Sequence, residues 1–280
     1  MIYDFSNVHR VIVKIGSNSL THKETGHLDY VKIEHRVREL SDLKNRGLDV
    51  CLVSSGAQAV GRQIMGIKER PSRLPEKQAL AAVGQARLMS IYSNFFREYG
   101  QNTGQVLMTK ATMVDNVSRK NAQNTFEELF REGIIPIVNE NDTISTYEIQ
   151  FGDNDTLSAM VANLTGADLL ILLSDIDGLY SSDPKTDPNA KLIPIVEKLD
   201  ESIENMGSSA PGSNVGTGGM ATKIRAAKIV VNSGIGMLIA NAEHMGVLHR
   251  IFDSEFDGTV FVPHFNEDFD IIDFLEEDIG

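Results

Sequence analysis

The sequence predicts an α/β fold in which a mainly parallel sheet is covered by helices on both faces. Short apolar runs of the kind that parallel sheets bury recur along the chain, and amphipathic helical patterns separate them almost throughout. This alternation is typical of parallel strands joined by crossover helices. The 280 residues contain no internal repeat and no linker rich in proline or serine, so one domain with two lobes is favoured over two independent domains.

Six strands are expected where the apolar runs occur, and one hairpin where polar and apolar residues alternate. The strands are predicted at residues 11–15, 49–53, 105–108, 134–138, 169–173 and 236–240, and the hairpin at 143–151. Helices are predicted between them at residues 30–46, 76–99, 122–132, 156–164 and 219–232. The first helix follows Asp29, a suitable N-cap, and stops before Gly47. Ligands of such sheets bind beyond the carboxyl ends of the strands, so the turns there are the places to look for a site.

Composition excludes several classes of function. The net charge of −13 argues against nucleic acid as the main partner, because phosphate backbones attract basic faces. The single cysteine, Cys51, excludes an internal disulfide and a multi-cysteine metal site, and its apolar neighbours favour a buried thiol over a nucleophile. No apolar run approaches the roughly 18 residues of a membrane span, and the amino terminus lacks a signal peptide's apolar core. A cytoplasmic protein without membrane contacts is therefore expected.

A glycine-rich run, GTGGMATK at residues 216–223, precedes the last predicted helix. Glycines let backbone N–H groups approach phosphate oxygens, the helix adds its positive amino-terminal end, and Lys223 adds a mobile charge. The spacing differs from the Walker pattern, so a nucleotide site here would belong to another lineage. Taken alone, the run could equally be a surface loop before a helix.

Two further turns carry residues suited to anions. The first strand ends in VKIGSNSLT, where Lys14 is costly to bury unless an anion meets it, although a lysine at a strand end could also extend to solvent. The second strand ends in SSGAQAVGR, where Ser55, Gly56 and Ala57 place free N–H groups at a helix start. That arrangement suits a carboxylate or phosphate oxygen, and it also fits a plain N-capped helix. It is not a GxSxG nucleophile elbow.

Acids, amides and one aromatic residue follow the later strands. VNENDTIS contains Asn139 and Asp142, and FGDNDTLSA contains Asn154 and Asp155 at the mouth of the next helix. Turns and caps alone would explain one such cluster, whereas two adjacent clusters predict a pocket for an amino group or for orienting lysines. LLSDIDGLYSSDP, which contains Ser174, Asp175 and Tyr180, could be a structural turn or a wall for a base or ribose.

Taken together in this order, the motifs resemble those of the amino acid kinase family, and most closely its glutamate 5-kinase branch, from about residue 10 to residue 262. The resemblance implies a three-layer α/β/α sandwich with a mainly parallel sheet. It also implies ATP-dependent phosphorylation of the γ-carboxylate of L-glutamate to L-glutamyl 5-phosphate, the first step from glutamate to proline. The alternatives are another kinase of the family that acts on a related carboxylate, or a non-catalytic amino-acid sensor with the same fold.

Residue roles are carried over from the matching motifs. Lys14 and Lys223 are expected to neutralise the transferring phosphoryl group, with Asp155 orienting both. The predicted glutamate-binding residues are Ser55, Gly56, Ala57, Asn139, Asp142 and Asn154. The predicted ATP-binding residues are Lys14, Gly16, Ser174, Asp175, Tyr180, Thr217, Gly218, Gly219, Met220 and Lys223. Mg²⁺ is expected to accompany ATP, and its ligands are not assigned.

The resemblance extends to partners and to one departure from the family. It implies a homo-oligomer, either dimer or tetramer, feedback inhibition by L-proline, and delivery of the reactive acyl phosphate to glutamyl phosphate reductase. Many bacterial members continue into a PUA domain, which the chain is expected to lack. The kinase domain is predicted at residues 1–263, and residues 264–280 form an acidic tail. Phe269, Ile272, Phe274 and Leu275 could dock this tail as a short helix, but its seven acids favour a solvated, dispensable segment.

Overall fold

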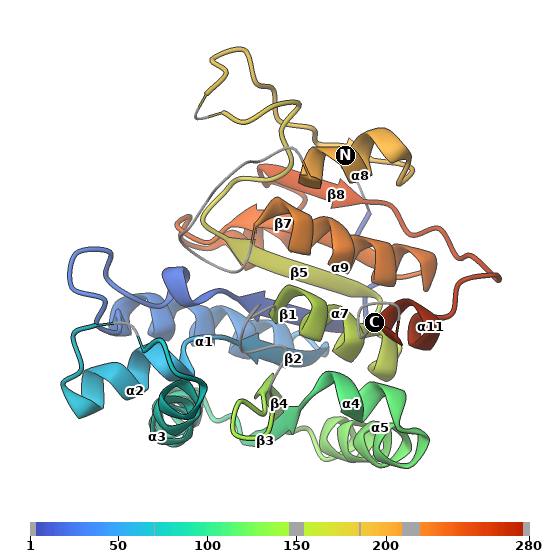
Figure 1. The fold of residues 1–280 in the computed structure, drawn as a ribbon. Coiled ribbons are helices and arrows are strands. Elements are labelled where there is room, and N and C mark those ends of the chain that lie inside the picture. Colours follow the sequence, from blue (N-terminus) through green and yellow to red (C-terminus); the bar gives the residue numbers. More distant parts are fainter. Residues whose placement is uncertain (1–3, 70, 146–153, 185, 209–218, 277–280) are drawn as a thin grey trace.

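A single sheet organises the computed structural model, which describes residues 4–69, 71–145, 154–184, 186–208 and 219–276. Within these ranges eight strands lie in the order β3-β4-β2-β1-β5-β7-β8-β6 (Figure 1). They are β1 (Arg10–Ile15), β2 (Asp49–Ser54), β3 (Thr103–Met108), β4 (Ile135–Glu140), β5 (Leu169–Ser174), β6 (Ile195–Val196), β7 (Gly236–Asn241) and β8 (Gly258–Phe261). Neighbouring strands pair in parallel except β7 with β8. The predicted fold class is confirmed.

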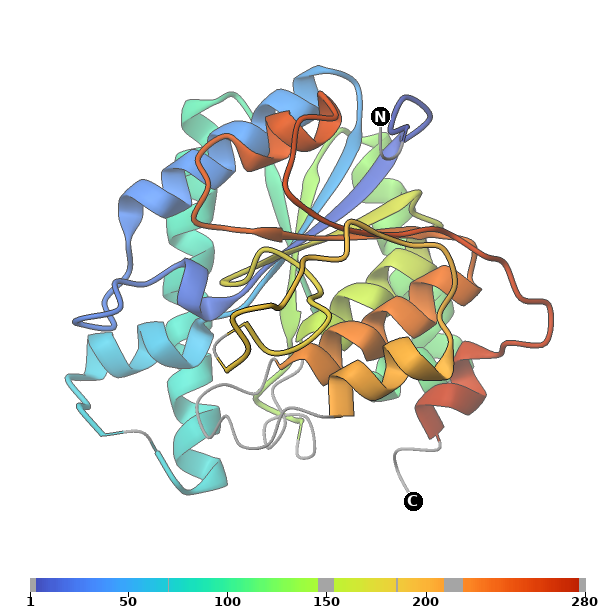
Figure 2. The same ribbon diagram turned by 90° about the horizontal axis from the view of Figure 1, so that it is seen from above.

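Helices cover both faces of the sheet and bury an apolar layer on each (Figures 1 and 2). On one face lie α4 (Lys110–Val114), α5 (Asn116–Arg131), α7 (Asn154–Thr165), α9 (Met220–Asn232) and α11 (Ile271–Glu276), and α8 (Glu201–Ser208) packs on α9. On the other face lie α1 (Tyr30–Asn45), α3 (Leu74–Glu98) and α10 (Val247–Phe252), and α2 (Ala57–Met65) packs on α3. Successive strand residues face opposite layers, as Val11 and Ile12 do.

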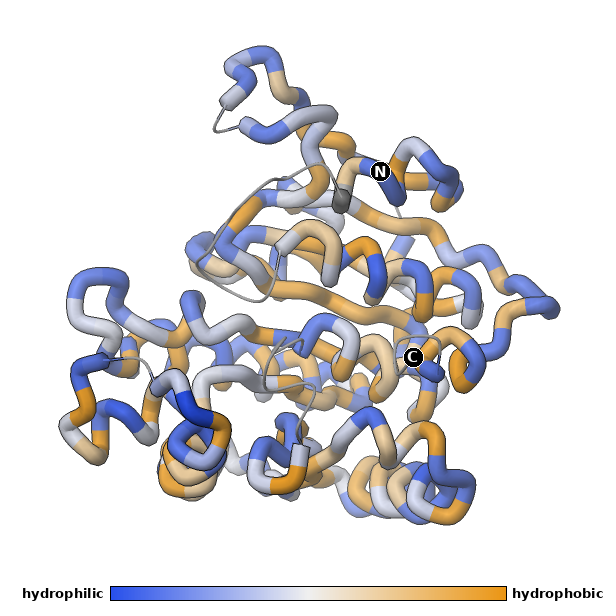
Figure 3. Tube along the Cα trace, viewed as in Figure 1, coloured by the Kyte–Doolittle hydropathy of each residue, from blue (hydrophilic) through white to orange (hydrophobic). Residues whose placement is uncertain are grey.

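The hydropathy of the chain follows this layering. Figure 3 shows apolar residues concentrated along the strands and polar residues along the outer turns. Cys51 lies fully buried in β2 as a free thiol, and burial raises its pKa, as expected of a structural cysteine. Among the described residues, no helix is both long and apolar enough to cross a membrane.

The predicted strands and helices are present. Some of their ends differ from the predicted residues, and polar side chains lie at these ends. Asp29 caps α1 by accepting from the backbone N–H groups of Val31 and Lys32, as predicted. Helix α5 begins six residues earlier than expected, because the Asp115 carboxylate accepts from Ser118 N at 2.8 Å. Strand β4 continues through Asn139 and Glu140, which the sequence analysis placed in a turn.

Several short elements were not expected from the sequence. They are β6, β8, α4, α8, α10, α11 and a 3₁₀ turn at Ser17–Ser19. Each is too short for a periodic pattern to separate it from a loop. The hairpin predicted at 143–151 falls mostly on residues outside the described part of the chain.

The carboxyl-terminal segment packs against the body, contrary to the expectation of a solvated tail. Leu275 is fully buried, and Phe269, Ile271 and Phe274 pack against the same apolar layer as α4, α7 and α9. The guanidinium of Arg225 in α9 lies 4.9 Å from the centre of the Phe274 ring. The sequence analysis expected a solvated tail because this segment is rich in acids. The acids of α11, such as the exposed Asp273, lie away from the face that docks, so they do not prevent docking.

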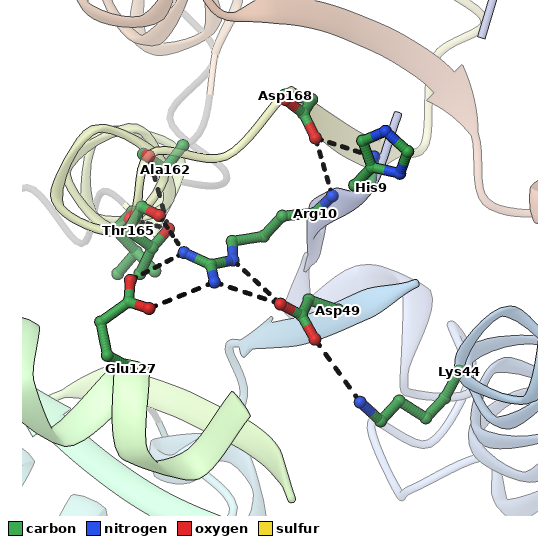
Figure 4. Close-up of polar contacts among 9 residues, drawn as sticks. His9, Arg10, Lys44, Asp49, Glu127, Ala162, Thr165 and Asp168 are labelled. Atoms are coloured by element: carbon green, nitrogen blue, oxygen red, sulfur yellow. Dashed lines mark hydrogen bonds and ion pairs between the residues drawn. The ribbon is translucent and has the colours of Figure 1, made fainter. Parts of the chain in front are cut away.

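A charged network closes the amino-terminal edge of the sheet (Figure 4). The Arg10 guanidinium of β1 donates to Asp49 of β2 at 3.1 Å, to Glu127 of α5 at 2.8 Å and to the Thr165 carbonyl of α7. The Asp168 carboxylate accepts from the backbone N–H of Arg10 at 2.8 Å. These bonds join β1, β2, α5 and α7 at the edge opposite the carboxyl ends of the strands.

Candidate active site

Three charged side chains from distant parts of the chain meet beyond the carboxyl end of β1. Lys14 Nζ lies 2.6 Å from Asp155 Oδ1, and Lys223 Nζ lies 3.0 Å from Asp155 Oδ2. All three residues are at least nine-tenths buried. Strand β1 supplies Lys14, the first turn of α7 supplies Asp155, and the first turn of α9 supplies Lys223. Two ammonium groups therefore share one carboxylate, as the sequence analysis expected.

The lysines determine the ionisation of this cluster. Burial alone would raise the pKa of Asp155, but the charges and hydrogen bonds of Lys14 and Lys223 outweigh it and hold the pKa well below its ordinary value of 3.8. Asp155 is therefore ionised at neutral pH. Two cations and one anion leave the cluster with one net positive charge, which suits a site that receives anions.

Thr222 is a further member of the cluster that sequence reasoning missed. Its hydroxyl lies 2.8 Å from Asp155 Oδ2 and 2.8 Å from the Gly219 carbonyl. Both of these partners only accept, and a hydroxyl has one proton to donate. Thr222 thus joins the start of α9 to the carboxylate between the lysines. Its position directly before Lys223 is the signal that could have found it.

A second, uncharged cluster joins β2, β4 and α7 beside the charged one. Asn154 Nδ2 lies 2.8 Å from Ser55 Oγ, 3.1 Å from the Ser54 carbonyl and 3.0 Å from Asn139 Oδ1. Asn139 Nδ2 in turn donates to Gln85 Oε1 of α3 at 2.8 Å. The structure thereby brings three of the predicted glutamate-binding residues, Ser55, Asn139 and Asn154, into contact. Because Asn154 and Asp155 are adjacent, both clusters depend on the start of α7.

The other predicted glutamate-binding residues next to this uncharged cluster lie at the start of α2. Gly56 is the N-cap with φ of 104°, a left-handed conformation that glycine adopts without strain, and Ala57 is the first helical residue. A Cβ on Gly84 of α3 would lie 1.7 Å from the Ala57 carbonyl oxygen, so α2 and α3 approach at backbone distance. A Cβ on Gly16 would lie 3.7 Å from Lys14 Nζ, which places the first turn beside the charged cluster.

The predicted nucleotide-side residues gather at the ends of β5 and β7. Ser174 ends β5 and is buried, and Asp175 beside it is exposed. Tyr180 donates through its hydroxyl to Asp177 Oδ2 at 2.8 Å, and Asn241 Nδ2 donates to Asp177 Oδ1 at 2.7 Å. The hydrogen bonds from Asn241 and Tyr180 lower the pKa of Asp177, and the bond to Asp177 raises that of Tyr180. The turn is therefore held by its own polar side chains.

Other predicted residues are less constrained by the structure. Asp142 lies half-buried in the turn after β4, and Gly219 and Met220 begin α9. Thr217 and Gly218 lie outside the described residues. Within the described ranges, no three His, Cys, Asp or Glu side chains are grouped so that they could hold a metal ion. A dedicated protein cage for a metal is thus not part of the site as described.

Comparisons with known proteins agree with this geometry. The model of the amino acid kinase family matches residues 9–241. Glutamate 5-kinase of Clostridium acetobutylicum is 53% identical over 92% of this chain and 96% of its own length. Glutamate 5-kinase of Carboxydothermus hydrogenoformans is 53% identical over 92% of this chain and 68% of its own length. That of Clostridium tetani is 51% identical over 91% of this chain and 95% of its own.

Solved structures agree on the fold. UMP kinase from Ureaplasma parvum superposes with a TM-score of 0.63 at 16% identity, over 91% of this chain and 99% of that one. An isopentenyl phosphate kinase superposes with a TM-score of 0.61 at 18% identity, over 91% of this chain and 100% of that one. At such identity these likenesses support the three-layer architecture alone.

Proposed function

The chain belongs to the amino acid kinase family, and from that premise we propose that it phosphorylates the γ-carboxylate of L-glutamate with ATP, giving L-glutamyl 5-phosphate for proline biosynthesis. The identity of 51–53% to three glutamate 5-kinases, over nine-tenths of the chain, carries the choice of substrate. The buried cluster of Lys14, Asp155 and Lys223 supports phosphoryl transfer between anions. With both lysines and their carboxylate present, a sensor without turnover is not favoured.

The reaction needs charge neutralisation more than proton transfer. A γ-carboxylate has an ordinary pKa of about 4.3, so it is already a nucleophile at neutral pH and needs no general base. Bringing it onto a phosphoryl group joins two anions, and negative charge accumulates on the transferred oxygens and the leaving group. Lys14 and Lys223 act by binding those oxygens. Fixed cations are most effective in a site from which water is excluded.

Asp155 acts through the lysines. Two ammonium groups without a counter-ion would repel each other and resist burial. The carboxylate holds one on each oxygen, so both point to the same side of the sheet. Because the pKa of Asp155 is lowered, the carboxylate does not take a proton from the reaction. Its role is positioning, and the lysines are the groups that would touch the reacting atoms.

The neighbouring clusters divide the two substrates between them. Glutamate is assigned to the side of Ser55, Gly56, Ala57, Asn139, Asp142 and Asn154, where Asp142 would accept the α-ammonium group and the α2 amino terminus would face a carboxylate. ATP is assigned to the side of Ser174, Asp175, Tyr180, Gly219 and Met220. Thr217 and Gly218, outside the described residues, are assigned to ATP from the sequence motif. Lys14, Gly16 and Lys223 lie where the two would meet.

Mg²⁺, oligomerisation and regulation belong to the same proposal. In phosphoryl transfer Mg²⁺ keeps several waters and is held by phosphates with one or two carboxylates, so a site without a protein cage is compatible with it. Bound to ATP, it would supply charge neutralisation at the phosphates. A cytoplasmic homo-oligomer, inhibition by L-proline and transfer of the product to a reductase are proposed from the family resemblance.

The direct test is formation of an acyl phosphate. Purified protein is incubated with MgATP, hydroxylamine and either L-glutamate, L-aspartate or N-acetyl-L-glutamate, and the hydroxamate is quantified with ADP. The proposal expects a hydroxamate with glutamate at a rate well above that with the other two acids. Equal or greater rates with aspartate or N-acetylglutamate would assign the chain to another kinase, and ADP without hydroxamate would exclude carboxyl phosphorylation.

A further inference from the structure

A buried ion pair lies on the opposite face of the sheet from the charged cluster and takes no part in the mechanism above. Arg36 and Glu39, one turn apart on α1, pair through Arg36 Nη1 and Glu39 Oε2, and each is less than 5% exposed. Burying two charges is costly unless every donor and acceptor finds a partner. The other partners of this pair therefore show what it holds.

Those partners lie in the loop after β7 and in the first turn of α10. Arg36 Nη2 donates to the Ala242 carbonyl at 2.6 Å and to the His244 carbonyl at 3.0 Å. Glu39 Oε1 accepts from Leu248 N, in the first turn of α10, at 3.1 Å. Figure 2 shows α10 lying alongside α1. One ion pair on α1 thus fixes both the loop at residues 242–246 and the start of the next helix.

The loop held in this way supports the nucleotide side of the site. Ala242, whose carbonyl binds Arg36, donates its own N–H to the Ser174 carbonyl at 2.7 Å. The preceding residue, Asn241, donates to Asp177, which also accepts from Tyr180. A path of hydrogen bonds therefore runs from Arg36 through a single residue to Ser174, and through the next residue to Asp177 and Tyr180.

A surface ion pair also connects α1 to the loop at residues 242–246, but more weakly. Lys32, one turn before Arg36, binds the Glu243 carboxylate at 2.8 Å. This pair is partly exposed and is screened by water and salt, so it contributes little rigidity. The buried pair is different, because three hydrogen-bonding partners besides the pair's own contact fix its geometry and it is shielded from solvent. Of these two contacts between α1 and the loop at residues 242–246, the buried pair is therefore the one that can fix the position of the loop.

We infer that the Arg36–Glu39 pair is a positioning clamp for the nucleotide site: it holds the loop at residues 242–246 so that Ser174, Asp177 and Tyr180 are placed to receive ATP. The inference rests on the assignment of ATP to this side under the proposed function. It extends that function, because Arg36 touches neither substrate and belongs to a helix that sequence motifs do not mark. Loss of the clamp is expected to weaken ATP binding and to leave glutamate binding unchanged.

The test measures the two substrates separately in four variants. Arg36→Met and Glu39→Gln each break the clamp, and the double variant Arg36→Met/Glu39→Leu removes both charges, which avoids an unpaired buried ion that could unfold the chain. Arg38→Met is the matched control, because Arg38 is an exposed arginine on the same helix. Binding of ATP without glutamate is measured by calorimetry, and both Michaelis constants by the hydroxamate assay.

The clamp predicts that the double variant folds and binds ATP about tenfold more weakly, a change of about 1.4 kcal/mol, while the Michaelis constant for glutamate stays within about twofold. Arg38→Met should bind as the parent does. A folded double variant with unchanged ATP affinity, or with equal losses for both substrates, would overturn the inference. A parent protein that binds no ATP would instead overturn the proposed function, so the two failures are distinguishable.

Discussion

At the scale of single residues, the site is explained by one carboxylate that serves two lysines. Asp155 pairs with both buried lysines, Lys14 and Lys223, and the lysines keep Asp155 ionised. Each group would be costly to bury alone, so the three depend on one another. This dependence makes the ionisation of Asp155 and the hydrogen bond from Thr222 testable features of the mechanism.

The lowered pKa of Asp155 predicts an absence of titration in the accessible pH range. A carboxyl group whose pKa is lowered by folding stabilises the fold fully above its ordinary value of 3.8, and that contribution is lost as pH falls through the folded pKa. Between pH 7 and pH 4 the ¹³C shift of the Asp155 carboxyl, assigned by comparison with Asp155→Asn, should therefore stay constant. A titration in that interval would show that the lysines do not hold it ionised.

Thr222 is predicted to position Asp155 through its hydroxyl. Thr222→Val keeps the shape of the side chain and removes the hydrogen bond at 2.8 Å to Asp155 Oδ2. Hydrogen bonds to charged groups contribute about 1.5 to 3 kcal/mol, so kcat should fall about tenfold or more.

Thr222→Ser keeps the donor and serves as the conservative control, with activity close to that of the parent. If Thr222→Val keeps near-parental activity while Thr222→Ser loses it, the methyl group matters and the proposed role of the hydroxyl is wrong. Thermal midpoints of both variants separate this effect from loss of stability.

At the scale of elements, helix starts bring the site together. The first turns of α2, α7 and α9 carry Ala57, Asp155 and Lys223. Their positions depend on close packing behind them, as where Gly84 of α3 meets the Ala57 carbonyl. The carboxyl-terminal helix α11 adds support on the face that carries α7 and α9.

The docking of α11 predicts that its apolar face stabilises the domain. Leu275 is fully buried, so Leu275→Ala should lower the free energy of unfolding by about 2 to 5 kcal/mol, as measured by denaturant titration. Asp273→Ala, an exposed substitution in the same helix, should change it by less than about 0.5 kcal/mol. Equal, small effects of the two substitutions would mean that the segment is a solvated tail after all.

At the scale of the whole molecule, the sequence predicts the layers well and the long-range contacts poorly. Continuous apolar runs located β1, β2, β4, β5 and β7, because strands buried on both faces have no polar alternation. A shorter run located β3, which is partly exposed at the edge of the sheet. The expectation that Lys14, Asp155 and Lys223 act together came from the resemblance of their motifs to those of the amino acid kinase family. The Arg36–Glu39 clamp could not be predicted, because it depends on which elements become neighbours in the fold. For the Thr222 hydrogen bond, the one signal in the sequence is the position of Thr222 directly before Lys223.

For the acidic tail, the sequence analysis made a wrong prediction: it expected a solvated segment where the structure has a docked helix. Charge counted over residues 264–280 favoured a solvated segment, but docking depends on which face of the helix carries the apolar groups. Six residues are too few for periodicity to indicate that face. The strand order likewise follows from pairing, including the antiparallel contact of β7 with β8 that the sequence does not mark.

The central claim is that two lysines from opposite ends of the chain neutralise the charge that develops during phosphoryl transfer to glutamate. The most direct measurement is kcat for hydroxamate formation by Lys14→Met and Lys223→Met at saturating MgATP and glutamate, with circular dichroism to verify folding. Removing one such interaction typically costs about 3 kcal/mol, so each variant should turn over at least about a hundredfold more slowly than the parent. Near-parental kcat in either folded variant would contradict the account.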